Sequence, residues 1–550
     1  MDASLNLVFD LLRQAALLHL DPLSLFFLVI LLFQGGAVAL AGMRATVGFW
    51  LSLAGMVLIL ASGAAFTLIF GGGLMTAAIW WVAARAAPKQ AAPYAAIAIF
   101  SIACLLPAVT LPASSLTFVL VLMATAALAG LAPFYNWQAR TYAALPEAMS
   151  ALVSGSGVNV AFYILIRYAF VTAVRVQHPW WGVVFVVMGA FSLLFGALKA
   201  VLEVDLRDVL AWSTVAGAGL IAIGAGLALQ AEASGHVALA GLALQAMLLW
   251  ILAHGLLRTL LFIGAGEVRE AVGTASLNWL GGLMRGMPRL GALMLLGAAG
   301  LAMLPLGPAF APLFLLVHAV IGTALQGGLD AHFGCALLLA VLGLGAALML
   351  MAAVKLIGLG FLGRPRSLHA AAAEDTRQGP FLGMAMLGLL CMPIALVPGL
   401  IVELCKPIIY VLAPLASTTK LTYTPLTLCL LAGLALLAVG MAQARWGQRG
   451  LRETPAWNGG FDRPPAWLPF GDPHTQSSAS GFAAPLISSF GKIVTIDPVQ
   501  RFLWPPLLRL YAWAARGVTR IRRLTPRLWL AVLFAVVLLA LLLSGLMRGG

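Results

Sequence analysis

Apolar stretches long enough to cross a lipid bilayer recur along this chain and constrain its fold more than any other feature. Each runs for about 18–25 residues without alternation of apolar and polar side chains, a pattern typical of a spanning helix. The composition agrees, because 62% of the 550 residues are hydrophobic and only 9% are charged. A soluble domain is about 45–50% apolar and about 25% charged. The sequence therefore predicts an all-α, multi-pass membrane protein, since backbone groups in lipid need internal partners.

The apolar pattern predicts about fourteen transmembrane helices. Leu290–Leu325 is long enough for one broken helix or two segments, and Ile401–Ala416, with two prolines, is predicted to be a short re-entrant or interfacial piece. The predicted spans are Leu23–Ala41, Val47–Phe70, Leu74–Ala86, Ala91–Val109, Leu116–Leu131, Ala148–Phe170, Trp180–Val201, Val209–Leu229, Val237–Ala265, Leu290–Leu325, Cys335–Leu359, Phe381–Leu400, Leu426–Ala442 and Leu528–Met547.

The net charge of +14 comes from basic residues that gather in alternate loops. Loops of one set carry ten scattered basic residues and the long stretch Arg445–Arg527, whereas the other set carries only Arg13, Arg175, Lys406 and Lys420. By the positive-inside rule the first set is cytoplasmic, which places both termini outside. We expect the chain to lie in a bacterial-type inner (cell) membrane. Nucleic-acid binding is disfavoured because no basic face has interleaved aromatic residues.

The distribution of polar residues predicts four parts. Residues 1–20 form an N-terminal segment, 21–443 the transmembrane bundle, 444–526 a cytoplasmic loop, and 527–550 a C-terminal transmembrane helix. Within the loop, 501–523 alternates arginines with leucine and aromatic residues, which suits an amphipathic helix along the membrane surface. Two interpretations remain open for it: a lateral helix that contacts neighbouring subunits, or a plain basic linker.

Ionisable residues inside spans are costly and are candidate functional groups by default. His254 and Arg258 are four residues apart, which places them on one face of the same helix, and Lys355 lies well inside its predicted span. Arg167 and Lys199 lie near helix ends, where long side chains reach the membrane surface. The full set of candidates is Arg167, Lys199, Glu203, His254, Arg258, His318 and Lys355. A structural role is favoured for His318.

Signatures of a soluble-type active site are missing from the sequence. There is no nucleophile–base constellation, no glycine-rich phosphate loop and no cluster with metal-ligand spacing. The five cysteines are scattered without a CxxC pair, which favours small buried side chains over disulfides or metal ligands. We therefore expect no catalytic residue, no cofactor site and no metal site.

Several segments resemble the antiporter-like subunits of complex I, Mrp antiporters and membrane-bound hydrogenases. Asp205–Thr214 is similar to their D-[IL]-K-R-[LV]-L-A-Y-S-[ST] segment, and His254–Gly266 resembles their H-x-x-x-K-x-L-L-F-[LM]-G-[AS]-G helix. Leu280–Pro288 resembles the L-G-G-L-x-[RK]-x-M-P loop that follows it. Pro133–Trp137 and Ser150–Gly155 resemble the P-L-H-x-W and S-A-L-x-x segments that flank the first broken helix.

Further segments narrow the resemblance to one branch. Val354–Ser367 and Ser478–Leu486 resemble the antiporter-like component of hydrogenase-four and formate hydrogenlyase. Asp21–Phe27 resembles the third span of that family, so the first two spans are expected to be absent. The resemblance covers the chain from about Asp21 to the C-terminus.

The resemblance implies a bundle of two inverted repeats, each with a discontinuous helix, as in transporters that bind at the membrane midplane. It also implies a hydrated line of Lys, Glu and His through the bundle, neighbouring membrane subunits and a peripheral redox module that supplies free energy. The residues that carry this implied proton or ion path here are His254, Arg258, Lys355, Glu203 and Lys199.

The departures from the family pattern fall mainly on its charged positions. Gly73 stands where the family has the glutamate of W-E-L-M, and Leu128 and Asn159 replace two lysines. Arg258 replaces the lysine after His254, and Pro312–Phe314 stands where the second broken helix has S-E-[WF]. Arginine effectively never releases its proton. The first repeat is therefore predicted to have lost its relay, whereas the second keeps His254 and Lys355.

Three functional hypotheses follow. The first is a non-catalytic, proton- or cation-translocating subunit of a hydrogenase-four or complex I-type oxidoreductase. The second is a membrane scaffold that keeps the fold without pumping. The third is a secondary transporter for a small solute, which would need a substrate site at the midplane.

Overall fold

The computed structural model is all-helical over the part of the chain that it describes. These residues are 18–42, 46–176, 178, 180–305, 307–413, 425–446 and 477–491, together with 505, 506 and 509. The chain divides into two units, Met1–Ile496 and Asp497–Gly550, and nearly all described residues belong to the first. Within the described ranges, nine helices are long and apolar enough to cross a membrane, and several shorter apolar helices accompany them.

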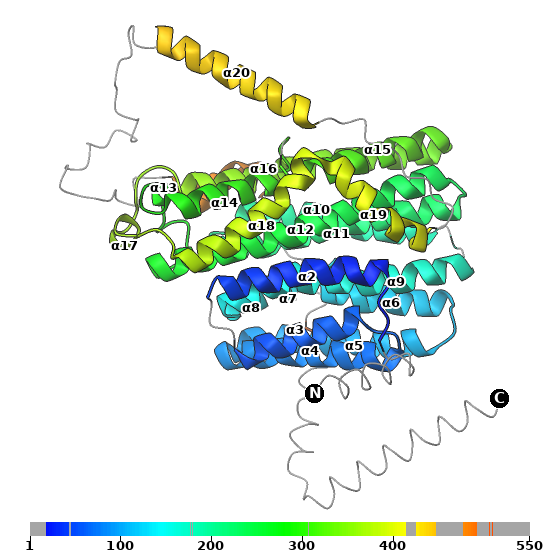
Figure 1. Cartoon of the computed structure of the whole chain (residues 1–550). Helices are drawn as coiled ribbons and strands as arrows, with labels where there is room; N and C mark the ends of the chain where they lie inside the picture. Colours follow the sequence, from blue (N-terminus) through cyan, green and yellow to red (C-terminus); the bar gives the residue numbers. More distant parts are fainter. Residues whose placement is uncertain are drawn as a thin grey trace, which may run out of the picture. The chain divides into compact units, whose positions relative to one another are not determined.

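The helices run side by side in two groups that follow the chain (Figure 1). The first group holds α2 (Pro22–Leu40), α3 (Val47–Leu60), α4 (Ala65–Ala86), α5 (Pro88–Thr110), α6 (Ser115–Ala129), α7 (Asn136–Ala144), α8 (Glu147–Leu152), the π-helical turn η1 (Val153–Gly157) and α9 (Val158–Val176). The second holds α10 (Trp180–Leu202), α11 (Leu206–Ala233), α12 (Val237–Val272), α14 (Pro288–Leu301), α15 (Phe310–Gln326), α16 (Leu329–Gly360), α18 (Gln378–Leu396) and α19 (Pro398–Leu412). The remaining helices are α13 (Leu283–Gly286), α17 (Leu368–Ala371), α20 (Pro425–Trp446), α21 (Ala479–Phe482) and α22 (Ala484–Phe490).

One predicted boundary was wrong. The sequence was divided into spans at 47–70 and 74–86, but the structure places the division at residues 61–64, between α3 and α4. Residues 71–73, three glycines between the two predicted spans, lie inside α4 instead. A Cβ on Gly71 would lie 2.9 Å from the carbonyl oxygen of Gly55 on α3. Glycine is needed there because two helix backbones approach closely, which is a packing requirement typical of membrane helices.

The chain breaks its helices at two places where the sequence suggested discontinuity. The segment 290–325 is divided into α14 and α15, with residues 302–309 between them. The motifs around Pro133 and Ser150 flank a second break, at Leu145–Pro146 between α7 and α8. Discontinuous helices therefore occur in both groups, and the relation of the groups as inverted repeats stays a prediction.

The later part of the bundle agrees with the remaining predictions where it is described. Pro398 begins a new helix, α19, over most of the predicted re-entrant piece, and α20 matches the predicted span near Leu426. The predicted amphipathic helix at 501–523 and the last span at 528–547 lie outside the described residues, apart from three isolated positions. The four-part division, the orientation and the re-entrant path remain predictions.

An ion pair fixes the start of α2 against α9. The Asp21 carboxylate caps α2 by accepting the backbone N–H of Ser24 at 2.8 Å, and it also pairs with Arg167 at 2.7 Å. Arg167 is thus bound to a carboxylate instead of extending alone to the membrane surface. Burial alone would raise the pKa of Asp21, but the Ser24 N–H and the Arg167 charge outweigh burial and lower this pKa.

Small residues bring α10 and α11 into close contact. Gly182, Gly189 and Gly196 recur every seven residues on α10, and they face the backbone of Gly226, Gly219 and Ala216 on α11. A Cβ on Gly189 would lie 2.5 Å from the Gly219 carbonyl oxygen. Lys199 lies on α10 and Glu203 between the two helices, so the spacing of this pair helps to position the candidate path residues.

We expect Gly189→Leu to destabilise the bundle by about 1–3 kcal/mol or more, because the added side chain collides with backbone that cannot move aside cheaply. Thermal unfolding of the full chain in detergent measures the effect. The matched control is Gly343→Leu on α16, where an added Cβ meets nothing within 4 Å. Equal stability of the two variants would contradict the packing argument.

Candidate proton-path site in the membrane interior

The predicted pair on α12 lies in the interior of the bundle. His254 and Arg258 are each only 3% exposed. The guanidinium of Arg258 reaches α11, where it donates one hydrogen bond to the Ser213 hydroxyl and another, at 2.6 Å, to the Ser213 carbonyl. Its charge is therefore held by one polar residue and is not paired with a carboxylate among the described residues.

The imidazole of His254 is positioned by close packing and has few polar contacts. The ring faces the backbone of Thr214, but neither ring nitrogen makes a hydrogen bond of good geometry within the described part of the chain. A Cβ at Gly217 on α11 would lie 2.5 Å from the ring, so only glycine leaves room for it. A buried histidine without direct partners indicates a place for water, because buried polar atoms are usually hydrogen-bonded.

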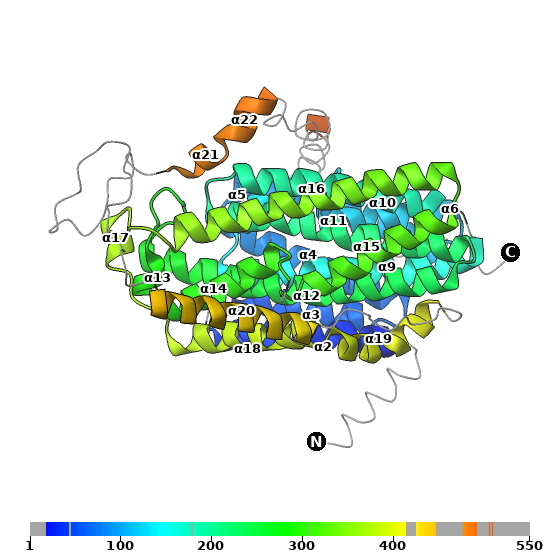
Figure 2. The same ribbon diagram turned by 90° about the horizontal axis from the view of Figure 1, so that it is seen from above.

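A small cavity lies beside this pair, next to the break between α14 and α15. Its volume is about 20 Å³, enough for a single water molecule, which needs roughly 10–15 Å³. The two short helices both pack along α12, one on each side of the break (Figure 2). The walls include His254 and Arg258 from α12, Gly217 from α11, Met303 and Ala309 from the break, and Met349 from α16.

The break itself carries an unusual backbone conformation. Met303 has φ of 53°, and it is the one non-glycine residue with positive φ among those described. Such a conformation costs of order 1–3 kcal/mol and persists where the surrounding structure imposes it, often at functional sites. The strained residue, the cavity and the unpartnered histidine therefore coincide, which makes this the strongest candidate site in the described bundle.

Lys355 lies near the end of α16, five residues before its last residue, and it is completely buried. Its ammonium group donates three hydrogen bonds to backbone carbonyls at the end of α10, those of Ala200 at 2.9 Å and of Val201 and Glu203 at 2.6 Å each. The last carbonyls of any helix lack partners within it. Lys355 therefore caps α10, a contact that the sequence did not reveal.

Glu203 and Lys199 lie beside that cap. Lys355 contacts the backbone carbonyl of Glu203, and no salt bridge joins it to the Glu203 carboxylate in the described structure. Burial raises the pKa of the Glu203 carboxyl, an effect that the charges of Lys199 and Lys355 oppose. The half-exposed Lys199 ammonium lies over the rings of Phe195 and Trp212, at 5.8 and 5.9 Å. The predicted path residues thus form two groups, one at the end of α10 and one on α12.

A polar cluster that the sequence did not single out lies where α2, η1 and α12 meet. The Ser156 hydroxyl donates to the side-chain oxygen of Gln34 at 2.5 Å, and Asn159 donates to the Ile251 carbonyl at 3.4 Å. Thr259 donates to two backbone carbonyls in the same region. All four side chains are buried and uncharged. In the sequence, only Gln34 could have indicated this cluster, because it is a polar residue within the apolar run of α2.

Arg207 was not among the candidate residues, although the sequence segment that contains it was recognised. Its guanidinium is buried and donates to the carbonyls of Tyr142 and Leu145, at 2.5 and 2.8 Å, and to the Ser150 hydroxyl at 2.7 Å. These groups lie on both sides of the break between α7 and α8. Arg207 therefore stabilises the discontinuity in the first group as Lys355 stabilises the end of α10.

Residues 98–343 match the family described as "NADH:quinone oxidoreductase/Mrp antiporter, TM". This stretch contains both helix breaks, the His254 site and the Gln34-facing part of η1. Over this stretch, which is less than half of the chain, the sequence is similar to the antiporter-like membrane subunits of that family. The chain is a multi-pass integral membrane protein.

Two bacterial proteins are similar to this chain in sequence. An uncharacterized protein of Mycobacterium tuberculosis is 31% identical over 399 residues, which cover 69% of this chain and 60% of that protein. Hydrogenase-4 component B of Escherichia coli is 30% identical over 284 residues, which cover 52% of this chain and 42% of that protein. The chain thus spans about 60% or less of the length of these two relatives.

The fold is similar to that of a chain in the membrane-bound sulfane sulfur reductase, an archaeal respiratory membrane complex. The TM-score is 0.72 at 18% identity, and the match covers 96% of this chain and 89% of that chain. The predicted all-helical membrane fold is therefore confirmed, whereas the count of about fourteen spans and the inverted repeats remain predictions. The path residues carried over from the family remain a prediction.

We expect Lys355→Met to lower stability by about 1–3 kcal/mol, because it leaves buried carbonyls at the end of α10 without a donor. Lys199→Met is the matched control, since it removes the same charge from a partly exposed side chain that lies over two aromatic rings and caps no helix in the described structure. Thermal unfolding of both full-length variants in detergent checks the difference. The capping role is wrong if the two variants unfold at the same temperature.

Proposed function

We propose that this chain is the antiporter-like membrane subunit of a hydrogenase-four or complex I-type assembly, and that it moves protons through the site at His254. The observation that carries this proposal is the water-sized cavity between His254, Arg258 and the broken helix α14–α15. The coupling to electron transfer would come from a peripheral redox module, with other membrane subunits as neighbours.

The chemistry of the pair supports His254 as the group that takes and releases protons. Imidazole is the side chain whose proton exchange falls near neutral pH, whereas a guanidinium stays protonated. Arg258, fixed by Ser213, supplies a constant positive charge that opposes protonation of the ring. A water in the cavity would hydrogen-bond to one ring nitrogen of His254 and pass a proton to or from it.

The cluster around Gln34 supports the loss of a relay in the first repeat. Amide and hydroxyl side chains neither take nor release a proton at working pH. Asn159 occupies the position of a family lysine, and it donates to a backbone carbonyl. The family glutamate is Gly73, beside which an added Cβ would meet nothing within 4 Å. Proton transfer in this half would need a charged group that the described cluster lacks.

A non-pumping scaffold is the alternative, and one observation favours it. Lys355 is the other retained family residue, and its ammonium group donates hydrogen bonds to three backbone carbonyls. These bonds give Lys355 a structural role. Transport of an organic solute is less well supported, because the cavity beside His254 has room for about one water molecule.

The names of the relatives support the proposed assembly. The name of hydrogenase-4 component B supports an association of this chain with a hydrogenase. The sulfane sulfur reductase is a respiratory membrane complex. The chain that matches in that complex works beside other subunits, which is the arrangement we propose here.

We expect His254→Gln to lower electron-transfer-driven proton uptake by about half or more, because the amide cannot exchange the proton that imidazole carries. The assembled complex in inverted membrane vesicles is the sample, and protons taken up per electron is the measurement. The control is His318→Gln, because the His318 ring is exposed and hydrogen-bonds to the Phe314 carbonyl of its own helix.

The outcome separates pumping from a scaffold role. Reduced proton uptake with an intact complex and normal electron transfer supports translocation through His254. An unchanged ratio of protons to electrons contradicts it and leaves the scaffold function. Loss of both assembly and electron transfer would show that His254 holds the structure together, which also counts against a relay role.

A further inference from the structure

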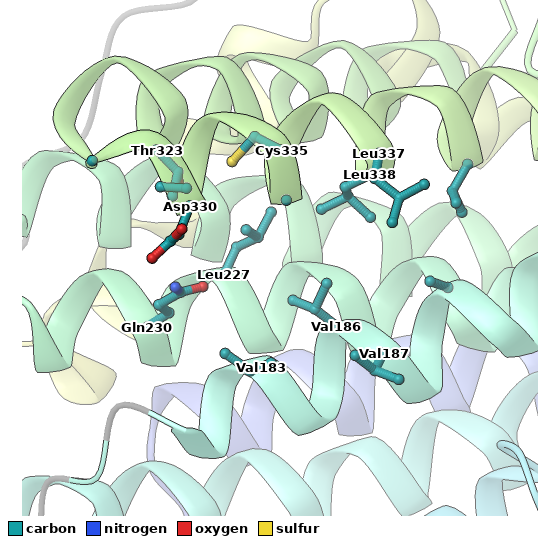
Figure 3. Close-up of a pocket in the computed structure, with 15 residues that line it drawn as sticks. Val183, Val186, Val187, Leu227, Gln230, Thr323, Asp330, Cys335, Leu337 and Leu338 are labelled. Carbon is teal, nitrogen blue, oxygen red and sulfur yellow. The ribbon is translucent and has the colours of Figure 1, made fainter.

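A groove on the second group of helices has chemistry that the proposed proton path does not use. It lies between α10, α11, α15 and α16 and has a volume of about 610 Å³. Figure 3 shows its lining side chains. The walls are apolar along most of its length, with Val183 and Val187 from α10 and Leu337 and Leu338 from α16.

The polar side chains of the groove gather at one end. Asp330, Gln230 and Thr323 lie close together there, whereas the valines and leucines extend away from them (Figure 3). Asp330 is in the first turn of α16, Gln230 is near the end of α11, and Thr323 is near the end of α15. The predicted orientation places these three helix ends at the membrane surface, so the polar end of the groove would face the headgroup region and its apolar body the acyl chains.

The groove is open to the lipid side of the bundle. Val187 is 61% exposed and Leu337 is 68% exposed, which is expected for side chains that face hydrocarbon. The same two helices are joined at their other ends, where Lys355 on α16 binds the last carbonyls of α10. The groove is therefore a place where α10 and α16 separate around space that an occupant must fill.

We propose that this groove binds one phospholipid with a primary ammonium headgroup, of the phosphatidylethanolamine class. The Asp330 carboxylate makes no salt bridge among the described residues. It attracts an ammonium group and repels anionic headgroups. A primary ammonium also has N–H donors for the Asp330 carboxylate and the Gln230 amide oxygen, which a choline headgroup lacks. An acyl chain then lies along the valine and leucine walls.

The lipid would have a structural effect on the candidate site. It would fill the separation between α10 and α16 at the end opposite the Lys355 cap, and α16 also contributes Met349 to the His254 cavity. By the predicted orientation, the polar end of the groove lies in the outer leaflet.

Lipid retention by the full-length protein tests this proposal. The protein is reconstituted in nanodiscs that contain equal amounts of phosphatidylethanolamine, phosphatidylcholine and phosphatidylglycerol, and retained lipid is then counted by native mass spectrometry after release into detergent. We expect one retained phosphatidylethanolamine per chain. Asp330→Asn should lower its retention about threefold to fivefold, as for loss of an exposed charge pair.

Two further variants sharpen the result. Val187→Trp fills the groove from a lipid-facing position and should displace the lipid without removing any charge. Glu374→Gln removes an exposed acid from a loop and should leave retention unchanged. A phosphatidylethanolamine with a photoreactive acyl chain should label α10 and the first half of α16 in the wild type, and should lose this labelling in Val187→Trp.

Three outcomes would overturn the proposal. Equal retention of all three lipids would show that the headgroup is not selected. Unchanged retention in both Asp330→Asn and Val187→Trp would place any bound lipid elsewhere. A photoreactive amino acid at position 337 that labels a neighbouring polypeptide in native membranes, and not lipid, would make the groove a subunit interface.

Discussion

The bundle depends on buried cations that bind backbone carbonyls at the ends and breaks of helices. A helix leaves its last carbonyls without partners, and lipid offers no water to replace them. Lys355 supplies donors at the end of α10, and Arg207 supplies them across the break between α7 and α8. Arg258 binds both the hydroxyl and the carbonyl of Ser213. None of the three forms a salt bridge in the described structure, and each donates hydrogen bonds to backbone carbonyls.

This arrangement distinguishes the cations that have a structural role from the imidazole of His254, which is proposed to exchange a proton. A cation bound to backbone carbonyls has a structural role, since the carbonyls would lose their donors if it moved away. His254 differs, because its ring nitrogens lack such bonds and a water-sized cavity lies beside it. The neutral Gln34 cluster, where α2 and η1 of the first group meet α12 of the second, offers no such exchangeable group. The proposed proton movement through one half alone follows from that difference.

Much of the helix pattern could be predicted from the sequence, because apolar length and proline or glycine placement act locally. The spans at 22–40, 206–233 and 329–360 and the break within 290–325 were predicted to within a few residues at most ends. The error at α3 and α4 arose because Gly71 serves close packing against Gly55 rather than a helix end. The same residue type has two uses, and only the neighbouring helix distinguishes them. The Gln34 cluster was missed for a related reason, since its members come from separate helices.

The sequence by itself determined that the chain lies in lipid, that it is helical, and that His254 and Arg258 share one helix face. Those conclusions rest on composition and on spacing within one segment, which the covalent chain fixes. Only the tertiary structure decided which partner each charge has. It placed Lys355 on the carbonyls of α10 instead of on a carboxylate, and it placed His254 against Gly217 and the break after Leu301. Hydrogen bonds and cavities join residues far apart in the chain, so their geometry exists only after the helices have packed.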